Sequence, residues 1–578
     1  GAVVTTTTRR RHRPGVAAVR PSLARAVLAL LRAHPTWGLL GAVGFLTTSL
    51  VGTYGVVTGW LWGQVVAALS AGRTPWPQVL VLAGGLLLVP PALAFAFRVY
   101  PLWWVSCTLR LRLSVLRGQT MQRRLRRTSP GEVVARALDS DRLVLYADRW
   151  VDVLLGSLLV LATAAFGGRV LAAAVLGAVL LVSALVSAAG APLAGGAARA
   201  AGDERARLGQ ALASAVEAAR TVKLATATSA VQEHLRAVDG RRIAASIREH
   251  RVRAVLNGVP GVLCEAGVVL AWAGVLLGAW ELATALLLST TLAGFAWFGT
   301  CAGAAVLEAP VARRWVQAAT ELSGGRDVTA LPPAVDLVAG RTPPPAPAGR
   351  VPLRELALEG LSAVHDDGTV GVEGVDLVVE RGSLVLLAGR VGSGKSSLLS
   401  SLVGLVDHEG VVRWNGREVA DPQVFLRPGQ VAYVGQVPRV LSGSFVDNVV
   451  LDHDRAAAPA LSAAQLGVDV AAAGGPGAVV GHRGVRLSGG QVQRLALARA
   501  LATEAELIVA DDVSSALDAR TELELWEALR RRGTTVVGST SKRSALERAD
   551  VVVVLEGGRV AATGRWSELA EDWGHLAG

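Results

Sequence analysis

The first half of the chain alternates between long apolar runs and charged stretches, and the second half has only short apolar runs. Six of the long runs approach or exceed the length of about 20 apolar residues that a helix needs to span a bilayer. They lie near residues 37–69, 78–105, 150–168, 169–195, 255–280 and 283–310. The pattern predicts a membrane all-α, six-helix transmembrane domain over residues 37–322.

The charge between the runs also alternates. The connections 106–149 and 196–254 each carry ten arginines. The alternate connections, 70–77, 167–169 and 281–282, together carry only Arg73 and Arg169. Lys and Arg accumulate on the cytoplasmic side of membrane proteins. We therefore expect an integral, multi-pass protein of the bacterial inner (plasma) membrane, in contact with the lipid bilayer, with both termini cytoplasmic.

Composition supports this interpretation. Of the 578 residues, 51% are apolar and 18% are charged, below the roughly 25% charged residues of soluble domains. The net charge of +12 is explained by the arginines of the cytoplasmic connections, so no nucleic-acid partner is expected. Cys107, Cys264 and Cys301 are too few for a disulfide scaffold and lack metal-ligand spacing, which favours a role as small apolar residues.

The segments around the spans are predicted to be helical. Residues 1–36 form a cytoplasmic N-terminus with an amphipathic helix over 21–35, between Pro21 and Pro35. The two arginine-rich connections contain few helix breakers. We therefore expect the second and third, and the fourth and fifth, spanning helices to continue far into the cytoplasm.

Few ionisable residues fall within the predicted spans, and Arg98 and Glu265 are the clearest of them. A charged side chain in mid-membrane costs about 2.5–3.5 kcal/mol on insertion scales, so such residues usually face a cavity or a partner. Glu265 is a candidate substrate-cavity residue, and a structural ion pair or a protonated acid is the alternative. Arg98 lies nearer the outer end of its span and can extend toward the interface.

Composition changes at residues 323–350, which are rich in Gly and Pro and are expected to form a linker. An α/β domain is predicted over 351–578. Its short strand Leu384–Ala388 precedes the pattern G-x-x-x-x-G-K-S, whose backbone N–H groups and helix N-terminus bind phosphates. The predicted ATP-binding residues of this loop are Gly389, Arg390, Val391, Gly392, Ser393, Gly394, Lys395, Ser396 and Ser397. Lys395 is expected to contact the β- and γ-phosphates, and Ser396 to hold Mg²⁺.

Two further motifs follow in the α/β domain. The pentapeptide L-S-G-G-Q comprises Leu487, Ser488, Gly489, Gly490 and Gln491. An apolar strand then ends in Asp511 and Asp512, where a Mg²⁺-coordinating acid is expected. The tetrapeptide S-A-L-D comes directly after this strand and comprises Ser515, Ala516, Leu517 and Asp518.

In this order and spacing, these motifs resemble the α/β P-loop nucleotide-binding domain of an ABC transporter. With the six preceding spans, almost the whole chain resembles an exporter-type half-transporter. Residues 128–141 resemble the family's first coupling loop, and residues 479–484 resemble the exporter loop before the L-S-G-G-Q. Gln436 matches the Q-loop.

The resemblance implies how such a domain works. ATP and Mg²⁺ are the expected cofactors, with Ser396, Gln436 and Asp511 as metal ligands. Two nucleotide-binding domains face head to tail. Each ATP is held between the phosphate loop of one domain and the L-S-G-G-Q of the other, and S-A-L-D corresponds to the D-loop.

Three positions depart from the family pattern. Asp512 stands where the family has the Glu that orients the attacking water, and its carboxylate is one methylene shorter. A misplacement of about 1 Å can cost roughly 100-fold in rate. Ser541 stands at the position of the switch His, and His365 stands where an aromatic residue is expected to stack on adenine.

An intact Lys395 beside these losses resembles the degenerate-site subunit of a heterodimeric ABC exporter. This interpretation predicts an ABC-type ATPase whose own site hydrolyses ATP weakly. The partner is a second half-transporter with intact Glu and His, and the transported molecule is an amphipathic or lipid-like compound or a peptide. The alternatives are a homodimer with Asp512 as a weak base, an importer with the exporter fold resembling siderophore uptake systems, and a membrane-tethered regulator that does not transport.

Overall fold

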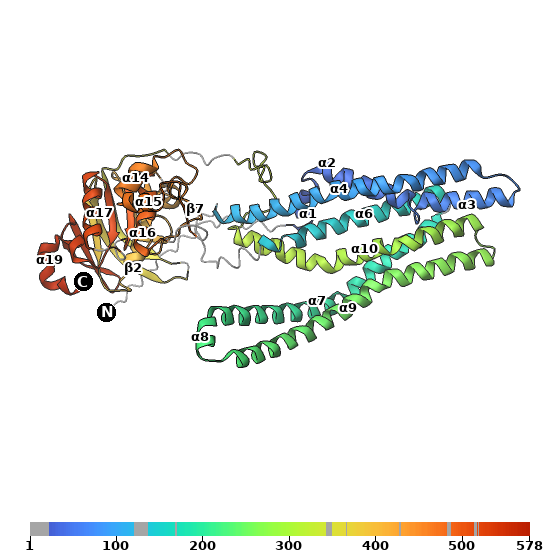
Figure 1. Cartoon of the computed structure of the whole chain (residues 1–578), viewed down its shortest axis with the longest axis horizontal. Helices are drawn as coiled ribbons and strands as arrows, with labels where there is room; N and C mark the ends of the chain where they lie inside the picture. Colours follow the sequence, from blue (N-terminus) through green and yellow to red (C-terminus); the bar gives the residue numbers. More distant parts are fainter. Residues whose placement is uncertain are drawn as a thin grey trace, which may run out of the picture. The chain divides into compact units, whose positions relative to one another are not determined.

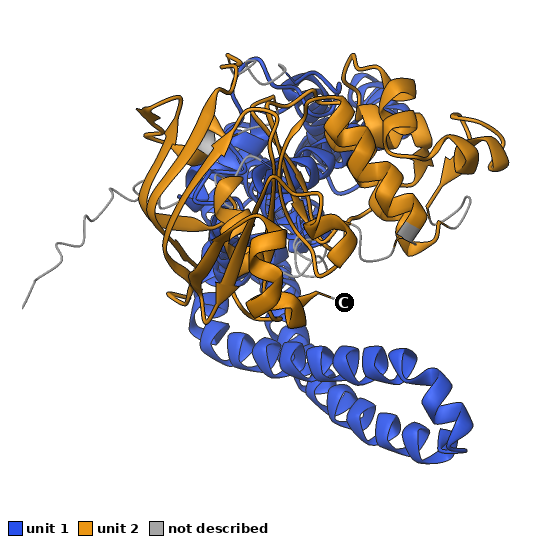
Figure 2. Cartoon of the chain, turned by 90° about the vertical axis from the view of Figure 1, so that its left-hand side faces the viewer, with its two compact units in different colours: residues 1–122, 127–343 blue, residues 123–126, 344–578 orange. Residues whose placement is uncertain are grey.

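The computed structural model describes residues 22–120, 137–167, 170–342, 349–365, 367–426, 429–481, 487–513, 517 and 519–577. The chain divides into two compact units, coloured blue and orange in Figure 2. The first unit is entirely helical in its described elements, and the second combines helices with β-sheets.

The first unit contains the predicted apolar helices (Figure 1). They are α2 (Pro35–Val51), α3 (Val56–Ser70), α4 (Trp76–Thr120), α6 (Asp141–Gly167), α7 (Val170–Glu217), α9 (Thr228–Leu276) and α10 (Leu282–Leu322). Taking α2 and α3 together, the described residues form six segments long and apolar enough to cross a membrane. The predicted six-helix fold is confirmed.

The first predicted span is divided into two helices. The helices α2 and α3 are separated at residues 52–55, where the Gly55 amide donates to the Gly52 carbonyl oxygen (2.8 Å). The Thr58 hydroxyl crosses this break and donates to the Val51 carbonyl oxygen (3.0 Å). The break therefore has its own hydrogen bonds, which the uniform apolar run could not reveal.

The amphipathic segment near the start forms helix α1 (Leu23–Leu31), with Ser22 at its N-cap position. Its buried side chains include Ala26, Val27 and Leu30, and the Leu30 carbonyl oxygen accepts a hydrogen bond from Trp103 Nε1 (3.3 Å). The helix therefore packs through its apolar face against α4, as its amphipathic pattern indicates.

The helices α7 and α9 extend well beyond their apolar runs, to lengths of 48 and 49 residues. They lie side by side and are joined by the short helix α8 (Ala219–Leu224), as Figure 1 shows. The expected helical continuation over 196–254 is thus present. The coupling-loop resemblance at 128–141 falls largely on residues 121–136, outside the described part of the chain.

The second unit is built on two main sheets. A mostly parallel sheet has the strand order β12-β11-β3-β10-β9-β6. Its strands are β3 (Leu384–Ala388), β6 (Val431–Val434), β9 (Leu507–Asp511), β10 (Thr535–Ser539), β11 (Val551–Glu556) and β12 (Arg559–Gly564). Every residue of β3, β9 and β10 is buried, as expected for parallel strands covered on both faces.

The second sheet is antiparallel, with the order β2-β1-β4-β5. Its strands are β1 (Glu355–Val364), β2 (Val370–Glu380), β4 (Asp407–Trp414) and β5 (Arg417–Glu418). Leu398 and Leu399 of α11 (Lys395–Leu402) lie in a core shared by the two sheets. Leu495 and Leu497 of α16 (Gly489–Leu501) belong to the core that includes the opposite face of β3.

The remaining described elements of this unit are short. They are β7 (Gly443–Ser444), β8 (Val479–Val480), α12 (Pro422–Phe425), α13 (Phe445–Val450), α14 (Ala457–Ala463), α15 (Gly467–Ala472), α17 (Ala519–Arg531), α18 (Arg543–Leu546), α19 (Trp566–Trp573) and η1 (Gly574–Leu576).

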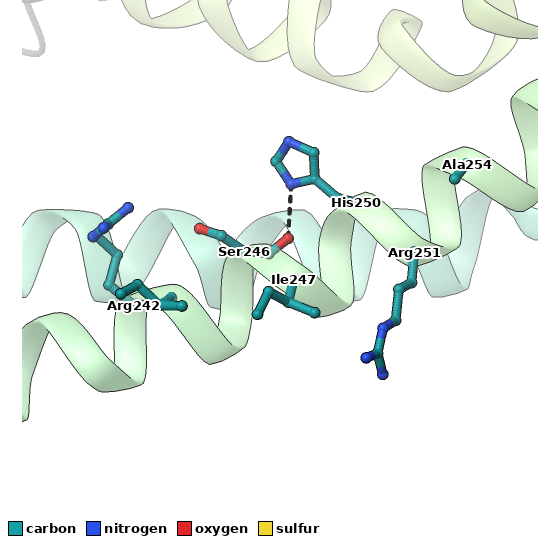
Figure 3. Close-up of a pocket in the computed structure, with 7 residues that line it drawn as sticks. Arg242, Ser246, Ile247, His250, Arg251 and Ala254 are labelled. Atoms are coloured by element: carbon teal, nitrogen blue, oxygen red, sulfur yellow. Dashed lines mark hydrogen bonds between the residues drawn. The ribbon is translucent and has the colours of Figure 1, made fainter.

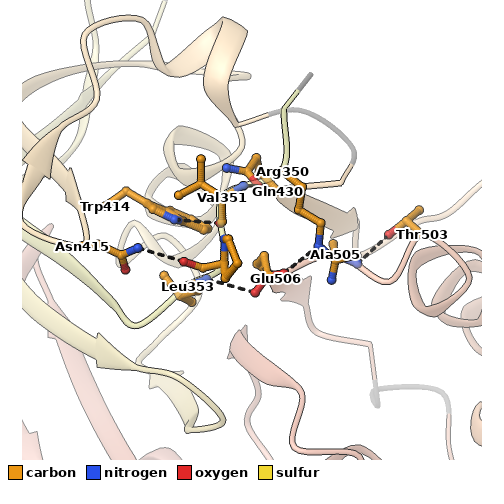
Figure 4. A network of polar contacts seen from close by, with 10 residues as sticks. Arg350, Val351, Leu353, Trp414, Asn415, Gln430, Thr503, Ala505 and Glu506 are labelled. Atoms are coloured by element: carbon orange, nitrogen blue, oxygen red, sulfur yellow. Dashed lines mark hydrogen bonds and ion pairs between the residues drawn. The ribbon is translucent and has the colours of Figure 1, made fainter. Parts of the chain in front are cut away.

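The chain enters the second unit through a hydrogen-bonded segment at residues 350–353 (Figure 4). The two Glu506 carboxylate oxygens accept from Arg350 Nε (2.6 Å) and from the Leu353 amide (3.0 Å). The Val351 amide donates to Gln430 Oε1 (2.9 Å). Glu506 directly precedes β9, so these bonds fix the entry segment to the amino end of a core strand.

We expect Glu506→Ala to release this entry segment. A hydrogen bond to a charged group contributes about 1.5–3 kcal/mol, so amide exchange at Val351 and Leu353 is expected to accelerate by about 10-fold or more. Hydrogen–deuterium exchange of peptides covering 350–356 measures this. Glu359→Ala is a matched control, because Glu359 pairs with Arg413 on the surface at 51% exposure. Equal exchange in both variants would contradict the anchoring role.

Candidate nucleotide site

The phosphate loop joins β3 to the first turn of α11. The parallel sheet orders β3, β10 and β9 side by side, so their carboxyl ends meet at one edge. Lys395 is the first residue of α11, and its Nζ donates to the carbonyl oxygens of Gly389 (2.6 Å) and Arg390 (3.0 Å). Through these bonds the start of the loop folds over the lysine side chain.

Two of the loop glycines are required by the backbone. Gly389 has φ 152° and Gly394 has φ 97°, in the region that side chains disfavour. A Cβ at Gly394 would also collide with the Gly371 carbonyl oxygen. The loop can therefore bring its backbone N–H groups toward a phosphate only with glycine at these positions.

Asp511 and Asp512 end strand β9 at the same edge. Asp511 is 5% exposed, and its Oδ1 accepts from Ser539 Oγ (2.7 Å) at the end of β10. Asp512 has φ 51°, and its amide donates to the Ser539 carbonyl oxygen (3.2 Å) and to Ser539 Oγ (3.0 Å). Ser539 thus holds both aspartates.

The electrostatics link the aspartates to the phosphate loop. Burial raises the pKa of Asp512, and the charge of Asp511 raises it further, while Gln436, Lys395 and Lys542 oppose the increase. Burial lowers the pKa of Lys395, and the charges of Asp511 and Asp512 oppose this decrease. The structure therefore brings one phosphate-loop cation and two carboxylates of the predicted site together.

Gln436 also reaches this edge. It follows β6, and its Nε2 donates to Asp512 Oδ2 (3.5 Å). The predicted Q-loop residue therefore contacts the residue at the base position.

The donor set of this edge fits a hard cation. Ser396 is the second residue of α11, directly after Lys395. Asp511 is buried, and Gln436 contacts Asp512, the residue after Asp511. Hydroxyl, carboxylate and amide oxygens are the ligands that Mg²⁺ prefers. The predicted metal ligands are thus consistent with Mg²⁺ bound together with a nucleotide.

Ser541 and His365 are the two other departures from the family pattern. Ser541 is exposed just beyond the end of β10, whereas its neighbour Thr540 is buried. His365 follows β1 and hydrogen-bonds through Nε2 to Ser397 Oγ of α11 (2.9 Å). The predicted adenine platform therefore lies against the phosphate-loop helix.

The L-S-G-G-Q begins helix α16 as an exposed N-terminus. Ser488 Oγ accepts from the Gln491 amide (3.3 Å), and the Ser488 amide donates to Gln491 Oε1 (2.7 Å), which is a capping box. Gln491 Nε2 also donates to Asp469 Oδ1 of α15 (2.7 Å). Ser488 and Gly489 are exposed, so the helix start can meet an anion from outside this domain.

Parts of the other motifs fall on residues that the structure does not describe. Of the D-loop prediction, Leu517 is described and is 7% exposed, and Ser515, Ala516 and Asp518 lie outside. In the predicted exporter loop at 479–484, residues 479–481 are described, and Val479–Val480 form strand β8.

Three residues at this edge were missed from the sequence. They are Ser539, Gln493, whose Nε2 donates to the Asp512 carbonyl oxygen (3.4 Å), and Lys542, whose Nζ donates to the Leu517 carbonyl oxygen (2.6 Å). Ser539 could have been recognised as a candidate site residue, because it is a polar residue at the end of a mostly apolar strand. Lys542 could have been recognised as well, as one of three lysines in the sequence.

In the first unit, Glu265 and Arg98 are both exposed, on α9 and α4. The structure shows a different polar cluster, in which Tyr100 donates to Asp148 (2.5 Å) and Cys301 Sγ to Asp152 Oδ2 (3.2 Å). Arg149 lies 3.9 Å from Asp152 and 4.0 Å from Glu308. Asp148 and Arg149 precede residue 150, where the sequence predicted the third span to begin, whereas α6 begins at Asp141. Asp152 and Glu308 lie within the predicted spans, but the apolar pattern did not indicate that these side chains would meet.

An open hollow lies along the surface of α9 (Figure 3). Ile243, Ile247 and Ala254 form part of its lining, and His250 Nδ1 hydrogen-bonds to the Ser246 carbonyl oxygen (2.8 Å). Its lining contains none of the predicted site residues, including Glu265.

Comparison with known proteins agrees with this geometry. Residues 372–515 match the family model described as ABC transporter, which implies ATP binding by the second unit. An ATP-dependent lipid A-core flippase of Alkalilimnicola ehrlichii is 35% identical over 212 residues, which are 35% of this chain and 36% of the flippase. The glutathione/L-cysteine transport system ATP-binding/permease protein CydD of Escherichia coli is 34% identical over 230 residues, or 38% of this chain and 39% of that protein.

The match thus spans somewhat more than a third of the length of these curated relatives. Among solved structures, a bacterial Atm1-family ABC exporter with ATP bound aligns with a TM-score of 0.75 and 19% identity. That alignment covers 96% of this chain and 100% of the exporter chain. The chain therefore has the fold of that exporter chain, and its six apolar helical segments precede a domain that matches the ABC transporter model.

Proposed function

We propose that this chain is one half of a heterodimeric, ATP-driven membrane exporter. Its own phosphate loop binds ATP with Mg²⁺ and cleaves it slowly, and its L-S-G-G-Q closes over the competent site of the partner half-transporter. The substrate class is amphipathic or lipid-like, and relatives named as lipid A-core flippases support this choice.

One observation carries the proposal. Asp512, at the base position, is held on a left-handed backbone by Ser539, and its side chain contacts Gln436. Its short side chain is thus tied to the Q-loop, and Ser541 offers a hydroxyl where the family has an imidazole. Lys395 and the loop glycines nevertheless keep the geometry that phosphate binding needs.

The residues of the site have separate roles in this proposal. Lys395 and the loop amides bind and orient the phosphates, and Ser396, Asp511 and Gln436 would hold Mg²⁺. Bound Mg²⁺ would neutralise phosphate charge. Asp512 keeps a carboxylate near the site but is a methylene too short to orient water as the family's Glu does.

The test is purification of the tagged chain from native membranes, followed by nucleotide analysis. We expect a second half-transporter with a Glu and a His to copurify, and unhydrolysed ATP to remain on this chain. Reconstituted vesicles are expected to move a labelled lipid in an ATP-dependent manner. A chain that purifies as a homodimer and hydrolyses ATP at two equal sites would contradict the proposal.

Restoring the Glu and the His together is expected to raise ATP hydrolysis only slightly. In Asp512→Glu/Ser541→His, total ATPase should rise by at most about 2-fold, the limit if a second site came to equal the first. His365 would remain at the adenine position, and transport per ATP should fall, because a site suited to holding ATP would release it. ATPase and transport rates in the same vesicles measure this. A proportional rise in both would mean that Asp512 and Ser541 have no role in retention.

A further inference from the structure

The last residue of β10 and the segment after it hydrogen-bond to two described residues that lie between β9 and α17. At the near end, Ser539 accepts two hydrogen bonds from the Asp512 amide, at 3.2 and 3.0 Å. At the far end, Lys542 Nζ donates to the Leu517 carbonyl oxygen at 2.6 Å. Two residues lie between Ser539 and Lys542, so one short segment contacts both Asp512 and Leu517, which are described residues between β9 and α17.

Lys542 is itself fixed by a buried acid. The Glu522 side chain, on α17, is 1% exposed, and its Oε2 lies 3.6 Å from Lys542 Nζ. Glu522 also accepts from Ser544 Oγ (3.1 Å) and Trp526 Nε1 (3.4 Å). A buried carboxylate requires a cation and hydrogen bonds, so Lys542 stays against α17 instead of extending into solvent.

The adjacent cation behaves differently. Arg543 pairs with Glu547 within helix α18, at 2.9 Å, and their side chains are 67% and 50% exposed. Exposed pairs of this kind contribute little to stability. Lys542 therefore contacts residues outside its own segment, Leu517 and Glu522, whereas among the described residues Arg543 pairs only within its own helix.

Ser539 and Lys542 act on the nucleotide site through one hydrogen bond and one electrostatic interaction. Ser539 Oγ also donates to Asp511 Oδ1 (2.7 Å), so a shift of the segment after β10 would move both aspartates. The Lys542 charge also acts on the Asp512 carboxylate. Outer partners of metal-binding carboxylates commonly set the affinity of the site.

We propose that Lys542 is a positioning residue that holds Leu517 and helix α17 against the end of β10 and thereby keeps Asp511 and Asp512 placed for Mg²⁺-dependent retention of ATP. The inference rests on the proposed function, because it assumes that this chain's own phosphate loop holds ATP. Lys542 acts through the backbone of Leu517 and the carboxylate of Glu522, and it need not touch the nucleotide.

Removing Lys542 alone would leave the Glu522 charge buried without its cation. The test therefore uses Lys542→Met/Glu522→Gln, in which the buried charge is removed together with the lysine. Lys542→Arg tests rescue by a conserved charge, and Arg543→Met is the matched control for the loss of a neighbouring cation. All variants are made in the full chain, purified with its partner from membranes.

The measurement is the release rate of radiolabelled ATP from this chain's site, with Mg²⁺ and with EDTA. We expect the double variant to release ATP about 10-fold faster than the wild type with Mg²⁺. Its release in EDTA should be unchanged, because the phosphate loop and Lys395 are intact. Lys542→Arg should retain ATP nearly as the wild type does, and Arg543→Met should match the wild type.

Three outcomes would overturn the inference. If the double variant retained ATP as the wild type does, the contacts of Lys542 would not act on the nucleotide site. Equally faster release with Mg²⁺ and with EDTA would show a general support of the domain instead of metal positioning. Rapid release or cleavage of ATP at this site in the wild type would overturn the proposed function as well, and so is distinguishable from the first two.

Discussion

Gly489→Asp is expected to nearly abolish ATP hydrolysis by the assembled transporter, with a loss of about 100-fold or more. Gly489 is the first residue of α16 and is exposed, directly after the N-cap Ser488. The helix N-terminus presents N–H groups and partial positive charge, which favour a phosphate. A carboxylate at this position would occupy and repel that phosphate.

In the proposed heterodimer, the L-S-G-G-Q of this chain and its phosphate loop belong to two different ATP sites. The ATP that meets Gly489 lies on the partner's phosphate loop, so the variant should lose turnover while this chain's own site still binds ATP. ATPase of the purified heterodimer measures the first quantity, and labelled ATP on this chain measures the second. Loss of ATP from this chain with normal turnover would reverse the assignment.

A matched control is available in the same domain. Gly467 is also the first residue of a helix, α15, and is also exposed, with open space around its Cβ position. Gly467→Asp therefore adds the same charge in the same helical context, and we expect near-normal turnover. Equal losses in the two variants would mean that an added charge, and not the L-S-G-G-Q position, causes the effect.

The parts of the structure that the sequence predicted are those fixed by local pattern. The length of an apolar run sets a spanning helix, and the phosphate loop needs its glycines and Lys395 within eight consecutive residues. The pattern also placed Asp511 at a strand end, because the four apolar residues 507–510 precede it. These features do not depend on distant contacts.

The missed features depend on which elements become neighbours. Ser539 meets Asp511 because β10 lies beside β9, and Lys542 meets Glu522 across a separation of 20 residues. In the first unit, Asp152 meets Cys301 because α6 packs against α10. Periodicity along one segment carries no information about such pairings, so they could not be predicted from it.

The second large effect is expected from Lys395→Ala. Its ammonium donates to two carbonyl oxygens of the phosphate loop and is expected to turn to the β- and γ-phosphates of bound ATP. A hydrogen bond to a charged group contributes about 1.5–3 kcal/mol, so ATP affinity at this site should fall by about 10- to 100-fold. Removing the lysine also frees the loop, which adds to the loss.

Turnover by the heterodimer should fall much less than binding. If this chain's site retains ATP and the partner's site cleaves it, the corresponding Lys→Ala change in the partner's phosphate loop should stop nearly all hydrolysis. Titration with a fluorescent ATP analogue and steady-state ATPase, on both single variants, measure this asymmetry. Arg532→Ala is the charge-loss control, because Arg532 lies before the amino end of β10, at the opposite edge of the sheet. Equal loss of turnover from the two lysine variants would indicate two equivalent sites, and Asp512 would then serve as a working base.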